Sequence, residues 1–391
     1  MVDVVLYDLM EEQLRLTPTN FRRYLFDDVD WEGRLTGIMG PSGVGKSTML
    51  LQYIIMHRNE GHHLYVSADN AYFSTHKLAD LASEFVKSGG THLYIDEVHK
   101  YGGWSRELKE VYDSHPELRI TFTGSSVLDI RKGEADLSRR VVLESMQGLS
   151  FREYLELYHG IVSRAYTLDE ILSHQVHLED LLHPLPFFQQ YLAEGYYPFA
   201  KEGRFASRML QVVNQTIEVD IMQYSEMKAT TARKLKQLLM IVSGLAPVKP
   251  NANSLAKEIG VSNNNVPEYL LLLERSGMLG QLRDDTSGLI SLGKVEKIYI
   301  DNPNLMTVLA GGNPDLGNLR ETFFYNQMRV RNHITSSRES DFCIKPYTFE
   351  VGGKRKGKKQ LADVPNGIVV RDDIEYGAGQ FVPLWHFGMN Y

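Results

Sequence analysis

The stretch that decides the fold is Gly40-Pro41-Ser42-Gly43-Val44-Gly45-Lys46-Ser47-Thr48. Its first eight residues match the pattern G-x-x-x-x-G-K-[ST] at every fixed position. The glycines allow backbone N–H groups to turn inward and surround phosphate oxygens. In this pattern the lysine reaches the β and γ phosphates, and the hydroxyl that follows it binds Mg²⁺. We therefore expect these nine residues to bind the phosphates of a nucleotide, with Ser47 as a ligand of Mg²⁺.

The flanking residues place this loop between a strand and a helix. Residues 34–39 have the pattern of a short apolar strand, and residues 47–55 that of an amphipathic helix. A helix that starts at the loop directs the positive end of its dipole toward an anion. This context favours a nucleotide-binding loop over a glycine-rich turn that binds none.

Two further apolar runs end in polar residues. Residues 92–97 end in Asp96 and Glu97, and residues 118–123 lead into Ser125. An open parallel sheet places its chemistry at the carboxyl ends of its strands. We expect Asp96 to hold Mg²⁺ through water and Glu97 to orient or deprotonate the attacking water. Ser125 either contacts the γ-phosphate or that water, or caps the next helix.

Composition is typical of a multidomain globular protein. The chain has 391 residues, of which 43% are hydrophobic and 23% charged, enough for two or three domains with their own cores. A net charge of −7 does not indicate nucleic-acid binding. A single cysteine, Cys343, excludes an internal disulfide framework and suits a reducing compartment. With no apolar run long enough for a membrane span and no signal peptide, we expect a cytoplasmic protein without membrane contact.

Periodicity divides the chain into five regions. Residues 1–30 are expected to be a helical lead-in, and residues 31–150 an α/β core in which strands alternate with helices. The expected strands are 34–39, 63–68, 92–97 and 118–123, and the expected helices are 46–57, 76–88 and 104–114. This alternation predicts a parallel sheet with right-handed crossovers.

The remaining residues change character twice. Residues 151–225 are helical and rich in aromatic side chains, which we interpret as a helical lid. Residues 226–290 show a helix-turn-helix pattern with a short helix ending at Gly260, and residues 279–300 are expected to add the strands of a wing. Residues 291–391 mix one helix with short strands and predict a small α/β or α+β domain.

These motifs together resemble those of a known group. With Glu97-Val98-His99-Lys100, residues 122–126 and residues 148–155, the chain is similar to prokaryotic AAA+ ATPases that carry a C-terminal domain of unknown function. That domain combines a winged helix with a nuclease-like fold. The resemblance covers nearly the whole chain and implies a P-loop ATPase that binds and hydrolyses ATP with Mg²⁺.

The resemblance also implies an arginine finger. Residues 136–140 match the family stretch before the next strand of the sheet, with Arg139 where glycine is frequent and Arg140 at the arginine position. AAA+ proteins use such an arginine on the γ-phosphate of a neighbouring subunit, where it neutralises charge in the transition state. This implies a homo-oligomer. The alternative is that Arg140 pairs with Glu134 or Asp136.

The last region resembles the PD-(D/E)XK nuclease fold. Glu321 lies on an expected helix, and Asp341 and Glu350 are candidate metal ligands. Such a site needs a lysine two residues beyond the second carboxylate, where this chain has Gly352. The first lysine is Lys354, roughly 13 Å further along an extended strand than Glu350. We therefore favour a domain that binds without cutting.

Two features bear on nucleic acid. Residues 354–359, Lys-Arg-Lys-Gly-Lys-Lys, are either a solvated loop or a phosphate-binding surface for DNA or RNA. The expected recognition helix begins with Asn263, Asn264 and Asn265, which suit adenine edges. Its exposed face otherwise offers Glu268 and Glu274 against Arg275, which is not a strong phosphate-binding face.

The residues support three functions of different classes. The first is an AAA+ ATPase whose cycle moves the winged-helix and C-terminal domains on nucleic acid or a protein partner. The second is a slow nucleotide-gated switch that binds a protein partner, and the third is an ATP-dependent nuclease. Glu97 favours the first over the second, because a switch needs no efficient base. Gly352 argues against the third.

Overall fold

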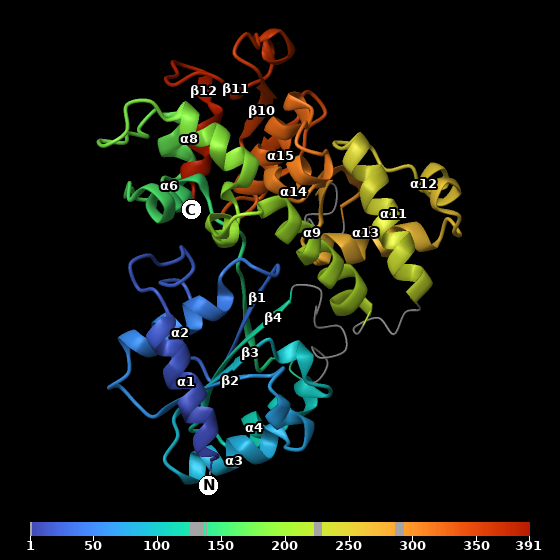
Figure 1. Ribbon diagram of the computed structural model, residues 1–391. Coiled ribbons are helices and arrows are strands. Elements are labelled where there is room, and N and C mark those ends of the chain that lie inside the picture. The colour runs from blue at the N-terminus through green and yellow to red at the C-terminus, as the bar shows by residue number, and fades with distance from the viewer. Residues whose placement is uncertain (1, 126–136, 138, 223–228, 286–292) are drawn as a thin grey trace. The chain divides into compact units, whose positions relative to one another are not determined.

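The computed structural model describes residues 2–125, 137, 139–222, 229–285 and 293–391. It divides the chain into two compact units, Met1–Gln147 and Gly148–Tyr391 (Figure 1). Among the described residues, no helix combines the length and the apolar character needed to cross a membrane.

The first unit is built on a five-stranded sheet in the order β2-β3-β4-β1-β5. Every neighbouring pair of its strands is parallel. The strands are β1 (Leu35–Gly40), β2 (His63–Ser67), β3 (His92–Asp96), β4 (Arg119–Ser125) and β5 (Val142–Ser145). All residues of β1 and β3 are buried, as expected for central strands of a parallel sheet covered on both faces.

Among the described residues, four α-helices accompany this sheet. They are α1 (Val4–Leu16), α2 (Lys46–Met56), α3 (Leu78–Lys87) and α4 (Trp104–Ser114). α1 packs against α2 and β2, and α3 packs against α4 (Figure 1). The expected strands and helices of this region are confirmed to within a few residues. The helical lead-in is shorter than expected, because Thr17 is extended before Pro18 and ends α1 at Leu16.

The second unit begins with helices. They are α6 (Phe151–His159), α7 (Leu168–Leu172), α8 (Leu185–Gln190), α9 (Phe205–Gln215), α11 (Ala229–Leu245), α12 (Ala252–Ile259) and α13 (Asn265–Arg275). The short helix α12 ends at Gly260 in the left-handed conformation, as predicted. After α13 come the antiparallel strands β6 (Leu279–Arg283) and β7 (Val295–Ile300). Three helices followed by two strands agree with the order expected of a winged helix, and that assignment stays a prediction.

The rest of the second unit is a mixed sheet with two helices. The helices are α14 (Pro303–Leu309) and α15 (Leu316–Met328), and the strands are β8 (Thr335–Ser336), β9 (Phe342–Ile344), β10 (Tyr347–Gly352), β11 (Gly367–Arg371) and β12 (Phe381–Pro383). Their order is β12-β11-β10-β9-β8. β10 is parallel to β11 and antiparallel to β9. The nuclease-like assignment of this sheet also stays a prediction.

The segment interpreted as a lid shares a core with the C-terminal residues. The Ser150 hydroxyl donates to the Tyr391 carbonyl at 2.7 Å, and the Gln327 amide donates to the Tyr191 hydroxyl at 3.0 Å. The rings of Phe188 and Phe323 meet edge to face at 4.8 Å between centroids. Residues 148–220 therefore belong to the second unit, and their action as a lid on nucleotide stays a prediction.

Candidate nucleotide-binding and hydrolysis site

The phosphate-loop pattern lies between β1, which ends at Gly40, and α2, which begins at Lys46. Gly43 and Gly45 have φ angles of 82° and 99°, a conformation that side chains with a Cβ rarely adopt. The buried Lys46 ammonium donates to the carbonyls of Gly40 and Pro41 at 2.9 Å each. The ammonium thus lies inside the loop, within the turn that the glycines make.

Asp96 is the last residue of β3 and is buried. Its carboxylate accepts hydrogen bonds from the Tyr65 hydroxyl at 2.8 Å and from the Thr123 hydroxyl. Burial, followed by the charge of Asp96, raises the pKa of Tyr65, so this phenol stays a donor. Two hydroxyls from the flanking strands β2 and β4 therefore fix the orientation of Asp96 and leave its negative charge.

Glu97 follows β3 in a left-handed conformation, with φ 51°. Its backbone N–H donates to the Thr123 hydroxyl at 2.9 Å. A non-glycine residue in this conformation costs of order 1 kcal/mol, and such outliers concentrate at functional sites. The His99 Nε2 atom lies 3.2 Å from the Glu97 Oε2 atom. The structure thus places a histidine against the predicted catalytic carboxylate.

Ser125 is the last residue of β4 and is buried. In the register between β1 and β4 it pairs with Gly40, so it lies beside the start of the phosphate loop. This position suits the contact with phosphate or water. Residues 126–136, including Ser126 and the helix that Ser125 would cap, lie outside the described residues.

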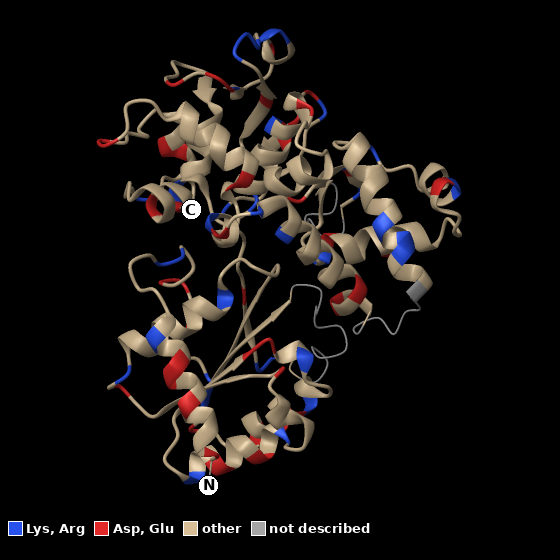
Figure 2. Ribbon diagram, in the orientation of Figure 1, with Lys and Arg blue, Asp and Glu red and all other residues tan. Residues whose placement is uncertain are grey.

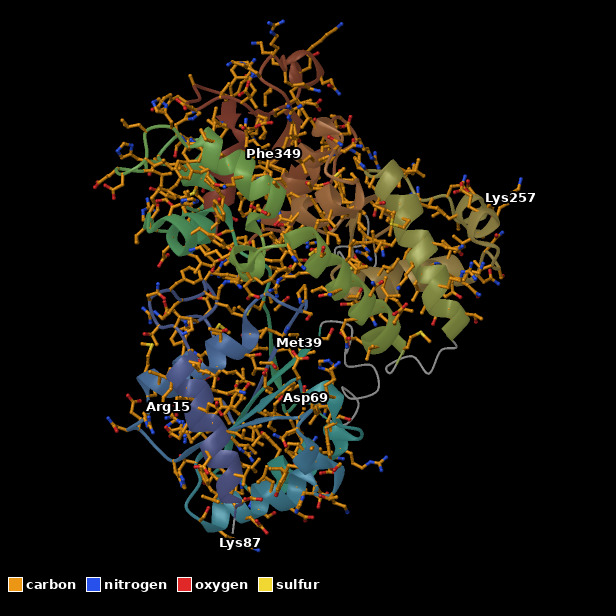
Figure 3. All side chains as sticks on the ribbon, in the orientation of Figure 1. Arg15, Met39, Asp69, Lys87, Lys257 and Phe349 are labelled. Atoms are coloured by element: carbon orange, nitrogen blue, oxygen red, sulfur yellow. The ribbon has the colours of Figure 1, made fainter. Side chains whose placement is uncertain are left out.

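The described carboxyl edge of the sheet therefore gathers the predicted residues. Gly40, Asp96 and Ser125 each end a parallel strand, and β4 lies between β1 and β3. Figure 3 labels Met39, directly before Gly40, and Asp69, two residues beyond the end of β2, at this edge. Tyr65 and Thr123 were not predicted, although their place one strand away from Asp96 follows once the strand order is known.

Arg140 lies at the opposite ends of the strands, near the amino end of β1. It precedes β5, whose Val142 pairs with Thr36 near the start of β1. Its guanidinium makes two hydrogen bonds to Asp113, at 2.9 and 3.1 Å, and hydrogen bonding to Arg140 lowers the pKa of Asp113. The partner is therefore Asp113, whereas Glu134 and Asp136 lie outside the described residues. Arg139 has a φ of 67°, which explains why glycine suits that position.

The carboxylates of the last region meet lysines. The Lys297 ammonium on β7 contacts Glu321 Oε2 at 3.1 Å and Asp341 Oδ1 at 3.2 Å. The Tyr299 hydroxyl also donates to Glu321, at 2.9 Å. Burial, followed by the charge of Asp341, raises the pKa of Glu321. Although burial opposes it, the charges of Glu321 and Asp341 raise the pKa of Lys297.

Glu350, the second predicted metal ligand, pairs with a different lysine. The buried Glu350 accepts from the Ser340 hydroxyl and forms an ion pair with Lys356. A Cβ added to Gly352 would meet the Lys356 side chain at 2.7 Å, so the stem of Lys356 covers this glycine. The lysine at Glu350 is therefore Lys356, whereas the Lys354 ammonium lies 3.9 Å from Asp373. Within the described part of the chain, no three or more His, Cys, Asp or Glu residues are grouped to hold a metal.

The two features predicted to contact nucleic acid, the basic loop at residues 354–359 and the expected recognition helix, differ in the positive charge that they expose. Lys354, Arg355, Lys358 and Lys359 are exposed, and in Figure 2 the loop after β10 carries blue segments. Asn263 donates to Asn253 at 2.5 Å. Glu274 on α13 pairs with Arg283, the last residue of β6, at 2.7 Å. The loop thus presents more exposed positive charge than the expected recognition helix.

Comparisons with known proteins agree with the fold predicted for the first unit. Residues 32–155 match a family model described as an AAA domain, and residues 186–316 match a domain of unknown function (DUF8612). The second match runs across the boundaries expected at 225 and 290. No curated protein matches the sequence. Together with the sheet order and the phosphate loop, the first match supports an AAA-type P-loop ATPase fold for residues 32–155.

Solved structures give weaker similarities. The Walker-type ATPase of Pyrococcus abyssi aligns with 16% identity and a TM-score of 0.41, covering 76% of this chain and 99% of that chain. RuvB of Thermotoga maritima aligns with 15% identity and a TM-score of 0.30 over 70% and 89% of the two chains. AMPPCP-bound DnaA from Aquifex aeolicus aligns with 14% identity and a TM-score of 0.26 over 70% and 89%. At these TM-scores the alignments carry no argument about function.

Proposed function

We propose that the first unit binds ATP with Mg²⁺ at Gly40–Thr48 and hydrolyses it. The observation that carries this proposal is the common edge of the sheet, where the phosphate loop, Asp96 and Ser125 lie at the ends of adjacent parallel strands. Lys46 supplies positive charge within the loop, where it suits the β and γ phosphates.

The residues present suit a magnesium ion. Ser47 and Asp96 offer hydroxyl and carboxylate oxygens, the hard ligands that Mg²⁺ prefers. When bound, Mg²⁺ neutralises charge on the phosphate oxygens. The hydroxyls of Tyr65 and Thr123 hold Asp96 in one orientation without cancelling its charge, which supports its role as a ligand through water.

Glu97 is the proposed base. Its carboxylate accepts the proton of a water molecule while the water oxygen bonds to the γ-phosphorus and the bond to the leaving oxygen of ADP breaks. The products are ADP and phosphate, with the proton on Glu97. His99, 3.2 Å from Glu97, orients this carboxylate, and Ser125 contacts the γ-phosphate or the water.

We further propose that hydrolysis serves the second unit, which acts on nucleic acid or on a protein partner. The exposed basic loop supports nucleic acid as the partner. The test is phosphate release from the full chain with and without DNA or RNA. Stimulation by either supports this role, whereas tight ATP binding with very slow and unstimulated turnover favours the nucleotide-gated switch.

Arg140 is proposed as a finger that acts between subunits. Arg140 lies near the amino ends of the strands, whereas the phosphate loop follows the carboxyl end of β1. This position argues against action within its own subunit. Arg140→Ala is expected to bind ATP and hydrolyse it poorly, and mixing it with Lys46→Ala protein is expected to restore some activity. Absence of rescue, together with a monomer in light scattering, would reject the finger and the homo-oligomer.

A further inference from the structure

A buried arginine in the lead-in segment contacts the phosphate loop. Arg23 is 6% exposed and precedes β1 in the sequence. Its guanidinium donates to the carbonyl of Val44, inside the loop, and to the carbonyl of Gln147 at 2.8 Å. Arg23 therefore joins two backbone positions that lie about a hundred residues apart in the chain.

The neighbouring Tyr24 contacts the same part of the chain, residues 145–147, which we call the exit segment. Its hydroxyl donates to the Ser145 carbonyl at 3.1 Å and accepts from the Gln147 N–H at 3.2 Å. Two consecutive lead-in residues thus hold residues 145–147, which begin at the last residue of β5. Neither residue belongs to the phosphate-loop pattern, so sequence motifs gave no sign of this contact.

The phosphate loop also contacts this exit segment directly. The Met146 N–H donates to the Met39 carbonyl at 2.7 Å. A Cβ added to Gly40 would lie 2.3 Å from the Met146 carbonyl oxygen, so the first glycine of the loop is also required by this close approach. The start of the loop and residues 145–147 are therefore in direct contact, next to the two carbonyls that Arg23 binds.

Gln147 is the last residue of the first unit, and Gly148 begins the second. We infer that Arg23 is a positioning residue that links occupancy of the phosphate loop to the backbone at Gln147, from which the second unit continues. This inference rests on the proposed binding of ATP. In this inference, bound phosphate attracts the loop N–H groups, and the resulting shift of the Val44 peptide is carried by its hydrogen bond to Arg23.

Arginine suits this role better than lysine does. Its planar guanidinium holds several donors in a rigid fork, so two carbonyls bound to it keep a fixed separation. A lysine ammonium is a point charge on a flexible stem and would hold the two carbonyls less rigidly. Displacement of Val44 is therefore transmitted to Gln147 through one rigid group.

Hydrogen–deuterium exchange of the full chain tests the inference. Exchange is measured with and without a non-hydrolysable ATP analogue and Mg²⁺, in peptides that cover residues 40–48 and 143–150. We expect the analogue to change exchange in both regions of the wild type. In Arg23→Met the change at 40–48 should remain and the change at 143–150 should be lost, whereas Arg23→Lys should keep part of it.

The adjacent arginine provides a matched control. The side chain of Arg22 is 45% exposed and lies 3.9 Å from Asp27, so Arg22→Met should behave as the wild type. If Arg23→Met does not fold, Tyr24→Phe removes the two hydrogen bonds of the neighbouring hydroxyl to Ser145 and Gln147 and should reduce the change at 143–150.

Three outcomes overturn the inference and are distinguishable. A change at 143–150 in Arg23→Met as large as in the wild type contradicts it while leaving ATP binding intact. A wild type that responds at 40–48 alone also contradicts it. A wild type that responds in neither region rejects the proposed ATP binding, and the inference with it.

Discussion

The two units hold carboxylates in different ways. In the first unit, the hydroxyls of Tyr65 and Thr123 hold Asp96. In the second, the Lys297 ammonium lies between Glu321 and Asp341. A hydroxyl donor positions a carboxylate without cancelling its charge, whereas a lysine supplies the positive charge that a metal ion would otherwise bring. The comparison explains why we assign chemistry to the first unit and binding to the second.

The largest effect is expected from Glu97→Gln. Glutamine keeps the shape of the side chain but accepts no proton, so turnover should fall by about 10²–10⁴-fold. Binding of a fluorescent ATP analogue should be unchanged. Phosphate release measures the loss, with Glu110→Gln on the exposed face of α4 as the control. Unchanged turnover in Glu97→Gln would move the role to another group, with His99 as the first candidate.

Lys46→Ala should weaken ATP binding by about 10–100-fold, because hydrogen bonds to charged groups contribute about 1.5–3 kcal/mol. Titration with the fluorescent analogue measures the affinity. Lys109→Ala on α4 is the control. If Lys46→Ala binds ATP with the affinity of the wild type, the phosphate loop is not the binding site. The first unit could then no longer be contrasted with the second as the site of chemistry.

Lys297→Met tests whether this lysine takes the place of a metal ion in the second unit. It removes the positive charge from two partly buried carboxylates, so the second unit should lose about 1–3 kcal/mol of stability. Mn²⁺ or Mg²⁺ should then stabilise this variant in thermal unfolding but leave the wild type unaffected. The neighbouring Lys294, whose side chain is 66% exposed and pairs with Glu296, supplies the control Lys294→Met.

The opposite result would also be informative. If divalent ions stabilise the wild-type second unit as strongly as the variant, Lys297 does not replace a metal ion there. The carboxylates Asp341 and Glu350 would then regain the metal-binding role that their positions in the sequence suggested.

The smallest effect is expected at the basic loop. Lys356 pairs with the buried Glu350 and is left intact. The four exposed cations Lys354, Arg355, Lys358 and Lys359 are replaced by glutamine. If each contacts a phosphate of duplex DNA, the slope of log K against log salt should fall by up to about 3.6, and affinity should fall with it.

The control for the loop changes the same charge on the first unit. It replaces four exposed cations by glutamine, Arg15, Lys77, Lys87 and Arg106, two of which are labelled in Figure 3. Equal loss of DNA binding in both variants would show a general effect of charge and reject the loop as a specific surface.

The sequence predicted the first unit well because its signals are local. The phosphate loop, the apolar runs before Gly40 and Asp96, and the alternation of strands and helices are each contained in short windows. The donors to Asp96 were not predictable in this way, since Tyr65 and Thr123 approach it from neighbouring strands. Arg23 was missed for the same reason.

The second unit was harder to predict because its contacts join distant segments. Lys297 comes from β7 and contacts Glu321 on α15 and Asp341, the residue directly before β9. Lys356 reaches Glu350 by folding back over Gly352, which the expected extended strand did not allow. Much of residues 151–222 is helical, as was predicted for residues 151–225, but periodicity does not reveal that this segment shares a core with residues near 391.

The most direct test follows phosphate release and nucleic-acid cleavage in one reaction. The full chain is incubated with ATP, Mg²⁺ or Mn²⁺, and linear, circular or single-stranded DNA or RNA. The account predicts phosphate release that is lost in Lys46→Ala and Glu97→Gln, while the nucleic acid stays intact. Cleavage that disappears in Asp341→Ala, or no phosphate release from protein that binds ATP, would contradict it.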